Sequence, residues 1–591
     1  MTHQEKLHAI RSMMALQQID AYIIPSADPH MSEYVPDHYK CIHFASGFSG
    51  SAGTLVITQN FAGLWADFRY FEQAELQLAG SGFELVKLQV QHTPEYIDWL
   101  YETLPDGATV AFDFTLLSIV IAEQLKQQLD HRSISIKNAD LLSLIWSNRP
   151  ALSHSKAHLL KDEDCGRSVA EKLGDLRLNM GKYKATLHLI STLDDIAWLF
   201  NIRGSDVSYN PVVLSFALIT QTEATLYIQT EKLSNEDKNA LQMSCVSVAQ
   251  YNEVDSHLTQ IAAGSCILLD EKRTCYQFLT LIPPSVRVIK DTNPVVFLKS
   301  IKNPVEIANM RSAMITDGVA LTRFFKWLEE NIGGGNVSEI SASERVKAFR
   351  EEGKGFAGLS FGSIAGYQAH AALPHYCPDD SSNTLLLSEG LFLLDSGGHY
   401  YYGTTDVTRT VPLGNNTNEE KRDYTLVLSA MITGSAAKFP KGTRGYQIDS
   451  LCRKQLWEFN INYGHGTGHG VGYYLNVHEG PQNIGPANAA VAMAPGMITS
   501  IEPGIYRPGK HGVRIENLVL TVKGDVSEFG EFLKFETITL AHIDTTLVIT
   551  DLLQPKQIQW LNSYNQLVFE KLSPLLKPDE CEWLSKKCQP I

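Results

Sequence analysis

The sequence predicts an α/β (α+β) protein with two similar N-terminal units and a larger C-terminal unit. Short apolar runs alternate with amphipathic stretches as far as about residue 147, and the same alternation recurs between residues 148 and 303. The remainder, residues 304–591, is rich in glycine and mixes both kinds of segment. We therefore expect three domains, residues 1–147, 148–303 and 304–591.

Continuous apolar runs of four to six residues predict buried strands, and apolar residues at helical spacing predict helices. The strands expected in the first two units are residues 21–25, 54–58, 109–112, 186–190, 224–228 and 265–269. The helices expected there are residues 5–18, a segment that follows on from residues 64–70, residues 165–182 and a segment around 196–200. Between the two units, residues 148–153 interrupt the pattern with a proline and polar residues.

The second boundary carries a helix-start signal. Asn303 is suited to the N-cap, Pro304 to the first helical position and Glu306 to the third. A long amphipathic helix should follow, from residue 307 to about residue 331, and should end at the glycines of residues 333–335.

The composition excludes several classes of protein. Fifty basic against 65 acidic residues give a formal net charge of −15, which argues against a nucleic-acid or anionic-lipid binder. The nine cysteines are scattered and form no CxxC pair, so we expect neither a disulfide framework nor a thiolate zinc site. Neither a cleavable leader nor a continuous apolar span is evident. We expect a cytoplasmic protein with neither nucleic acid nor membrane as a partner.

The segment 375–516 contains four carboxylates and one histidine in apolar or glycine-rich surroundings: Asp395, Asp406, His469, Glu502 and Glu516. Asp395 ends an apolar run, and Asp406 follows eleven residues later on a segment suited to a strand. Two antiparallel strands would bring both carboxylates to one side of their sheet. Burying charged carboxylates is costly unless they are paired or bind metal.

This donor set suits two divalent cations. Oxygen-dominated ligation favours Mn²⁺, Co²⁺ or Zn²⁺ with open water positions over a closed thiolate zinc site. Two cations roughly 3.5–4 Å apart would bridge a water and lower its pKa from ~15.7 toward ~7.

Each residue alone also has a purely structural interpretation. An aspartate after a strand is usually a turn or cap residue, and a single histidine is usually a hydrogen-bonded structural group. His465 and His469 are four residues apart, but the interleaved glycines make a helix improbable. The same glycines superficially suggest a phosphate loop, but no GK[ST] follows. Only the combination of all five residues favours a metal site.

The contexts LLDSG, TTDVTRT, HGTGHGVG, EPG and RIEN, in this order, resemble the pita-bread metallopeptidase family. Within it, the chain is most similar to the cytosolic-type, three-domain Xaa-Pro aminopeptidases. The resemblance extends to residues 30–34, 46–54, 67–70, 196–206 and 589–591. It implies two creatinase-like N-terminal domains followed by a catalytic pita-bread domain with a C-terminal extension.

The resemblance also implies an activity: release of the N-terminal residue from peptides with proline in second position, by attack of a metal-bridging hydroxide. Asp395 would chelate one metal ion, and Asp406 and Glu516 would bridge both. His469 and Glu502 would complete the second site, and Glu502 would also transfer a proton.

Other residues receive expected roles from the same resemblance. His375, His465 and His478 would surround the substrate. Arg514 lies two residues before Glu516, so alternation places it on the same strand face, where it would orient Asp395 or another nearby acid; an ordinary exposed arginine is the alternative. Arg69 would either help close the substrate entrance or form a surface salt bridge. A homodimer is expected as well.

The sequence departs from the family at two places. The segment 368–376 lacks the Asn-Gly turn expected before the first site histidine. His375 is still the better match, because it lies 20 residues before Asp395 as in the family pattern, and His370 is left without a family role. Ile501 replaces an acidic residue that often precedes the EPG motif.

Three alternatives share parts of this pattern. Prolidase shares the metal centre but cleaves dipeptides, and the three-domain length favours the aminopeptidase. About 300 residues upstream of the metal domain disfavour methionine aminopeptidase. A pita-bread scaffold used as a binding or histone-chaperone module is disfavoured because all five ligands are present and acidic tails are not.

Overall fold

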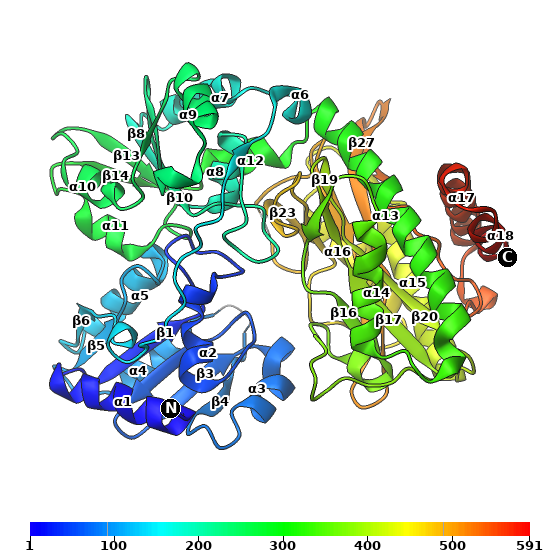
Figure 1. Cartoon of the computed structure of the whole chain (residues 1–591), viewed down its shortest axis with the longest axis horizontal. Coiled ribbons are helices and arrows are strands. Elements are labelled where there is room, and N and C mark those ends of the chain that lie inside the picture. Colours follow the sequence, from blue (N-terminus) through cyan, green and yellow to red (C-terminus); the bar gives the residue numbers. More distant parts are fainter. Residues whose placement is uncertain (91–92, 489) are drawn as a thin grey trace. The chain divides into compact units, whose positions relative to one another are not determined.

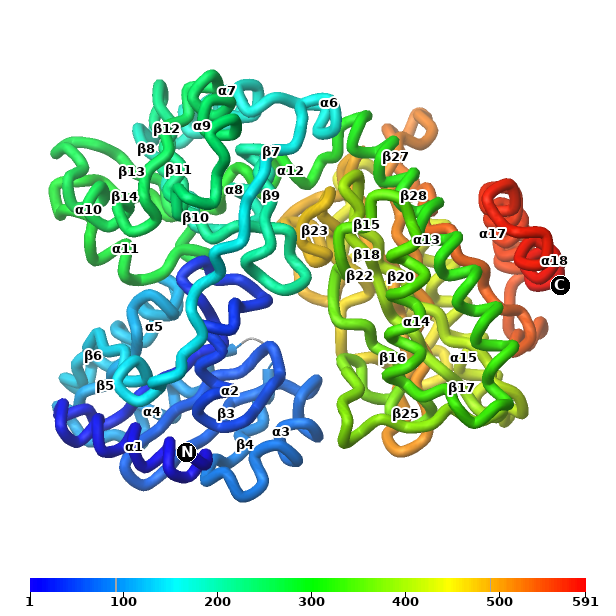
Figure 2. Tube along the Cα trace, in the orientation of Figure 1, coloured from blue at the N-terminus to red at the C-terminus, as the bar shows by residue number. Residues whose placement is uncertain are grey.

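The computed structural model describes residues 1–90, 93–488 and 490–591, and it divides into two compact units (Figures 1 and 2). The first unit consists of Met1–Asp162 and Arg167–Val295, and the second of Glu163–Gly166 and Val296–Ile591. Among the described residues, no helix is both long and apolar enough to cross a membrane.

Two six-stranded sheets form the first unit, and their strands run in the same relative directions. The orders are β4-β3-β2-β1-β5-β6 and β12-β11-β10-β8-β13-β14. In both sheets the central strand has an antiparallel neighbour on one side and a parallel neighbour on the other. The recurrence expected from the sequence is therefore present in the sheets. Their strands are β1 (Ala21–Pro25), β2 (Thr54–Thr58), β3 (Ala62–Ala66), β4 (Glu84–Lys87), β5 (Thr109–Phe112), β6 (Ser135–Asn138), β8 (Leu187–Ile190), β10 (Ser215–Thr220), β11 (Ala224–Ile228), β12 (Val246–Ala249), β13 (Cys266–Leu269) and β14 (Arg287–Lys290).

Helices cover these sheets with their apolar faces. On α5, for example, Ala122, Leu125 and Leu129 are fully buried against the first sheet. The helices of this unit are α1 (His3–Leu16), α2 (Cys41–Ser46), α3 (Phe71–Gln77), α4 (Tyr96–Thr103), α5 (Ile119–Asp130), α7 (Val169–Lys182), α8 (Leu193–Leu199), α9 (Asn235–Met243), α10 (Glu253–Thr259) and α11 (Tyr276–Leu281). The short strands β7 (His158–Leu159) and β9 (Ile202–Arg203) pair with each other.

The second unit has two main sheets: β16-β17-β20, and β21-β28-β27-β24-β22-β23. Smaller pairings are β15-β18-β19 and β25-β26. The strands are β15 (Phe356–Leu359), β16 (Ile364–Tyr367), β17 (Leu391–Ser396), β18 (Gly398–Tyr400), β19 (Gly403–Thr404), β20 (Val407–Pro412), β21 (Lys438–Pro440), β22 (Gly468–Gly470), β23 (Glu479–Ile484), β24 (Ile498–Ile501), β25 (Gly504–Arg507), β26 (His511–Arg514), β27 (Asn517–Ser527) and β28 (Gly530–Thr537).

Helices pack on these sheets and close two apolar cores. Phe324 of α13 and Val346 of α14 are buried with Phe392 of β17. On the six-stranded sheet, Val427 of α15 and Ile448 of α16 share a second core. The helices are α13 (Pro304–Asn331), α14 (Glu339–Glu351), α15 (Asn418–Ser435), α16 (Gly445–Trp457), α17 (Pro555–Leu572) and α18 (Pro578–Lys587). Two short helices, α6 (Asp162–Cys165) and α12 (Pro294–Ser300), lie where the chain passes from one unit to the other.

Arg409 of β20 joins the two main sheets. Its guanidinium is buried and donates to the carbonyl oxygens of Glu516 and His542, to Oδ1 of Asn517 and to the hydroxyl of Tyr564, the last two at 2.9 Å. Because these acceptors come from separate segments, one side chain fixes the spacing of the strands that border the site described below.

The start of α13 is as predicted. Asn303 is the N-cap, and its Oδ1 accepts from the backbone N–H groups of Val305 (2.9 Å) and Glu306 (3.0 Å). Glu306 in turn accepts from the N–H of Asn303 at 2.9 Å, which completes a capping box.

Replacing Asn303 by Ala removes the oxygen that accepts both N–H groups. We expect the Asn303→Ala protein to lose about 1 kcal/mol of unfolding free energy, seen as a lower Tm for the C-terminal unit in calorimetry. The Asn303→Asp variant keeps the capping oxygen but loses the bond from Nδ2 to the carbonyl of Cys165 at 2.8 Å, so its Tm should lie between those of Asn303→Ala and the wild type. Equal Tm values for Asn303→Ala and wild type would show that the cap contributes nothing.

Candidate metal centre

Six strands of the second unit carry or border the residues that the sequence singled out. Asp395 lies near the end of β17, and Asp406 directly precedes β20. These two strands pair antiparallel, with Asp395 opposite Thr408, as expected from the spacing of the two acids. His469 is the central residue of β22, Glu502 follows β24, and Glu516 lies between β26 and β27.

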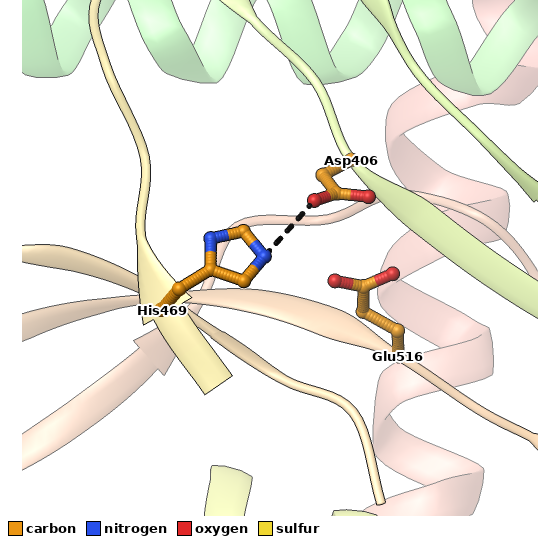
Figure 3. Close-up of side chains that lie close together, drawn as sticks. All are labelled: Asp406, His469 and Glu516. Carbon is orange, nitrogen blue, oxygen red and sulfur yellow. Dashed lines mark ion pairs between the residues drawn. The ribbon is translucent and has the colours of Figure 1, made fainter. Parts of the chain in front are cut away.

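Asp406, His469 and Glu516 offer ligand atoms that all lie within 4.8 Å of one another (Figure 3). Nε2 of His469 is 3.4 Å from Oδ2 of Asp406 and 3.4 Å from Oε1 of Glu502. In Figure 3 the imidazole and the two carboxylates point toward a common space. The structure thus brings His469 together with three of the four predicted carboxylates.

The orientation of His469 leaves Nε2 available as a ligand. Its Nδ1 lies 2.9 Å from the carbonyl oxygen of Gly470, to which a protonated Nδ1 donates. That bond favours the tautomer whose Nε2 carries a lone pair. The backbone N–H of His469 donates to Oγ of Ser500 at 3.0 Å, and this hydroxyl lies 3.2 Å from Oε1 of Glu502. One serine therefore fixes both residues.

The carboxylates fit cations because two of their buried oxygens lack donors. Oδ2 of Asp395 accepts from Nη2 of Arg514 at 2.6 Å, and Oε2 of Glu516 accepts from the hydroxyl of Thr408 at 2.9 Å. Among the described residues, none donates a hydrogen bond to the other two oxygens, Asp395 Oδ1 and Glu516 Oε1. A buried anionic oxygen without a donor is costly, and divalent cations would satisfy both.

Mutual repulsion and burial shift the protonation of the site. Burial, the Asp406 charge and the Glu502 charge raise the pKa of Glu516 well above its ordinary value. Burial raises the pKa of Glu502 to about 7, although His469 and Arg514 oppose the shift. Burial alone would lower the pKa of His469, but its contacts with Asp406 and Glu502 raise it to about 9. The site without metal therefore holds protons that cations would displace.

Arg514 links Asp395 to one of the site histidines through Tyr506 of β25. Nη1 of Arg514 donates to the Tyr506 hydroxyl at 2.7 Å, and Nε2 of His465 lies 2.8 Å from the same hydroxyl. Burial, followed by the charge of Arg514, lowers the pKa of His465 to about 3, so this imidazole is neutral. The sequence analysis missed Tyr506. The sequence signal for it is weak: Tyr506 lies four residues after Glu502 in a segment suited to a strand.

The remaining sequence-predicted residues are placed as follows. The rings of His478 and His469 are 4.4 Å apart, centroid to centroid, at 84°. His375 is exposed in the unit, and the carbonyl of the preceding residue, Pro374, accepts from Nη2 of Arg514 at 3.3 Å. Arg69 belongs to the first unit, where it forms a two-pronged ion pair with Asp67 at 2.8 and 2.7 Å.

Comparison with known families accounts for nearly the whole chain. Metallopeptidase family M24 matches residues 308–523, and the C-terminal region of the same peptidases matches residues 531–591. The creatinase/prolidase N-terminal domain matches twice, at residues 6–149 and 148–306.

Similar proteins match over the full length. A probable Xaa-Pro aminopeptidase P of Sordaria macrospora is 38% identical, covering 99% of both chains. Human Xaa-Pro aminopeptidase 2 is 38% identical, covering 99% of this chain and 88% of its own. The crystal structure of a cytosolic X-prolyl aminopeptidase with a dinuclear active site, from Caenorhabditis elegans, superposes with a TM-score of 0.95 at 36% identity and covers 100% of both chains.

The chain therefore belongs to metallopeptidase family M24, and within it to the Xaa-Pro aminopeptidases. The predicted fold class is confirmed: two creatinase-like N-terminal domains are followed by a pita-bread domain.

The protonation of the site predicts that metal uptake releases protons. With a pKa of about 9, His469 is protonated at pH 7.5 and must become neutral to bind a cation. We expect at least about one proton to leave for each protein loaded with Mn²⁺, and the affinity to rise with pH up to about 9. Calorimetric titration in HEPES and in Tris measures this, since the two buffers differ in ionisation enthalpy. Identical binding enthalpies in both buffers would contradict the prediction.

Proposed function

We propose that this protein is a metal-dependent aminopeptidase that releases the N-terminal residue from peptides with proline in second position. The observation that carries the proposal is the cluster of Asp406, His469 and Glu516, inside the segment that matches family M24. Oε1 of Glu516 and Oδ1 of the neighbouring predicted ligand Asp395 accept from no donor among the described residues. The proposed domains are residues 1–147, 148–303 and 304–591, with the catalytic chemistry confined to the third.

Two divalent cations, Mn²⁺ first and Zn²⁺ or Co²⁺ as alternatives, suit the five donors. In our proposal Asp395 holds one cation, Asp406 and Glu516 are shared by both, and His469 with Glu502 holds the other. A donor set with four carboxylates and one imidazole is dominated by hard oxygen atoms, which favours Mn²⁺ over the thiolate-bound zinc of closed structural sites. The C. elegans enzyme has a dinuclear active site, which supports the same stoichiometry here.

Two cations held by these residues would supply a water that is deprotonated near neutral pH, as the nucleophile for the carbonyl carbon of the first peptide residue. Glu502 would take the proton that this water loses and would return it to the leaving nitrogen when the C–N bond breaks. The leaving nitrogen needs this proton because it departs as an amine and not as an amide anion. Since the amide before proline has no N–H, recognition of this bond cannot use that donor.

The three histidines are proposed to contact the substrate. His375 and His478 would stabilise the developing oxyanion, and His465, held neutral beside Tyr506, would face the proline side. Arg514 would hold Asp395 in its ligating orientation through the contact at 2.6 Å. For Arg69 we propose a part in closing the substrate entrance.

Further proposals concern location and assembly. A cytoplasmic location agrees with the C. elegans relative, which is described as a cytosolic enzyme. We also propose a homodimer. We propose neither nucleic acid nor a membrane as a partner, and the net charge of −15 argues against nucleic acid.

If Asp406 and Glu516 are shared by two cations, replacing either should remove both ions. We expect Asp406→Ala and Glu516→Ala to lose nearly all bound Mn²⁺ and at least about 10³-fold in activity, because each change deletes a ligand of both cations. Mass-spectrometric metal analysis after gel filtration measures the occupancy. Glu580→Gln, a buried carboxylate on α18, is the control and should retain full metal. Full occupancy in either alanine variant would rule out the shared-ligand assignment.

The peptidase activity itself is tested with two substrates. We expect Mn²⁺-loaded protein to release free arginine from Arg-Pro-Pro and to leave Arg-Pro largely intact, because the proposed activity is that of an aminopeptidase acting on longer peptides. Mass spectrometry of the products distinguishes these results. Cleavage mainly of Arg-Pro would identify a prolidase. If neither peptide is cleaved while metal is bound, the peptidase proposal fails and the scaffold serves as a binding module.

A further inference from the structure

A buried carboxylate outside the metal centre gathers four hydrogen-bond donors. Glu339, the first residue of α14, is fully buried. Its Oε1 accepts from the N–H of Tyr367 at 2.8 Å and lies 2.9 Å from Nδ1 of His370. Its Oε2 accepts from the Tyr376 hydroxyl at 2.8 Å and from the N–H of Thr384 at 3.0 Å. An anion buried to this extent is stable only because these donors surround it.

All four donors belong to one stretch, residues 367–384, and His375 lies within it. Beyond the short helical turn Gln368–Ala372, residues 373–384 form neither helix nor strand. The backbone bonds within this part belong to isolated turns, such as the one from the N–H of Tyr376 to the carbonyl of Leu373 at 3.0 Å, so side-chain contacts add to what fixes its place. The backbone N–H of Glu339 also donates to the carbonyl of Thr384 at 3.1 Å, so the start of α14 holds the far end of the stretch twice.

His375 is held on both sides by residues with different anchors. On one side, Pro374 accepts from Arg514, which also binds Asp395. On the other side, Tyr376 is bound to Glu339, and its ring stacks on that of His370 with centroids 4.5 Å apart. The first anchor ties the stretch to the metal centre, and the second ties it to α14.

We propose that Glu339 is a positioning residue that fixes the main chain at His375 through Tyr376 and His370, and so sets where His375 meets the substrate carbonyl. The proposal rests on the substrate role given to His375 under the proposed function. It also gives a structural role to His370, which matched no family role, because its imidazole satisfies Glu339 and supports the Tyr376 ring.

The test is a double-mutant cycle between Glu339 and His375. Glu339→Gln keeps the size of the side chain but replaces one carboxylate oxygen by an NH2 group. This group cannot accept a hydrogen bond, so two of the four donors then face another donor. We expect kcat/KM for Arg-Pro-Pro to fall at least about tenfold, with metal content unchanged. In a His375→Ala background the same substitution should change kcat/KM by less than about twofold, because the group it positions is already gone.

The matched control is Glu580→Gln. Glu580 is also a buried carboxylate of the second unit, bound to the N–H of Lys577 at 2.8 Å and to Nε of Arg323 at 3.2 Å, and none of these partners belongs to the site. Its kcat/KM should equal the wild-type value. A loss in Glu339→Gln that is equally large with and without His375, or no loss at all, would overturn the proposal.

Two further measurements keep the outcome decisive. If Glu339→Gln does not fold, Tyr376→Phe removes a single donor, and its expected loss of about threefold should likewise vanish in the His375→Ala background. If the wild type cleaves no Xaa-Pro peptide, the proposed function fails, and hydrogen exchange decides the positioning role separately. Glu339→Gln should then accelerate exchange in residues 367–384, and Glu580→Gln should not; equal exchange in both would refute it.

Discussion

The structure of the second unit depends on one electrostatic constraint, the cost of gathering carboxylates in an interior with little water. Asp395, Asp406 and Glu516 are all nearly inaccessible to solvent. Each protein donor near them satisfies only part of their charge: Arg514 serves one oxygen of Asp395, and Thr408 serves one oxygen of Glu516. The unsatisfied remainder is what gives the site its affinity for cations.

Such a site must be rigid, because carboxylates that are free to move would turn toward solvent. Rigidity comes from placing each ligand at or near the end of a strand and then locking the strands together. Thr408 accepts the N–H of Glu516 through its carbonyl at 3.1 Å and donates its hydroxyl to the same side chain. Arg409, the next residue, binds the carbonyl of Glu516 from the other side. Two consecutive residues of β20 thus fix one ligand by main chain and side chain.

The sequence predicts those parts of this arrangement that local patterns determine. The strands Ala21–Pro25, Thr54–Thr58 and Thr109–Phe112 have the predicted bounds because each is a continuous apolar run flanked by polar residues. The N-cap of α13 is equally local, since Asn303 and Glu306 are three residues apart. The pairing of β17 with β20 follows from the spacing of two acids.

Long-range polar contacts could not be predicted in the same way. Tyr506 lies 41 residues from its partner His465, and Glu339 lies 37 residues from Tyr376. A tyrosine in a strand or a glutamate at a helix start has many ordinary structural uses, so neither stands out before the fold brings its partners together. The ligand roles themselves remain predictions, since they depend on ions that the sequence does not contain.

The two donor-free oxygens, Asp395 Oδ1 and Glu516 Oε1, have a consequence for the lifetime of the protein. A ligand that binds only the folded state adds to its stability by mass action, by about 2.7 kcal/mol when its free concentration is 100 times its Kd. The folded C-terminal unit would therefore become harder to unfold as the supply of the bound cation rises, and cellular proteases would degrade it more readily as that supply falls. Metal availability would then set how much of this protein persists as well as how much of it is active.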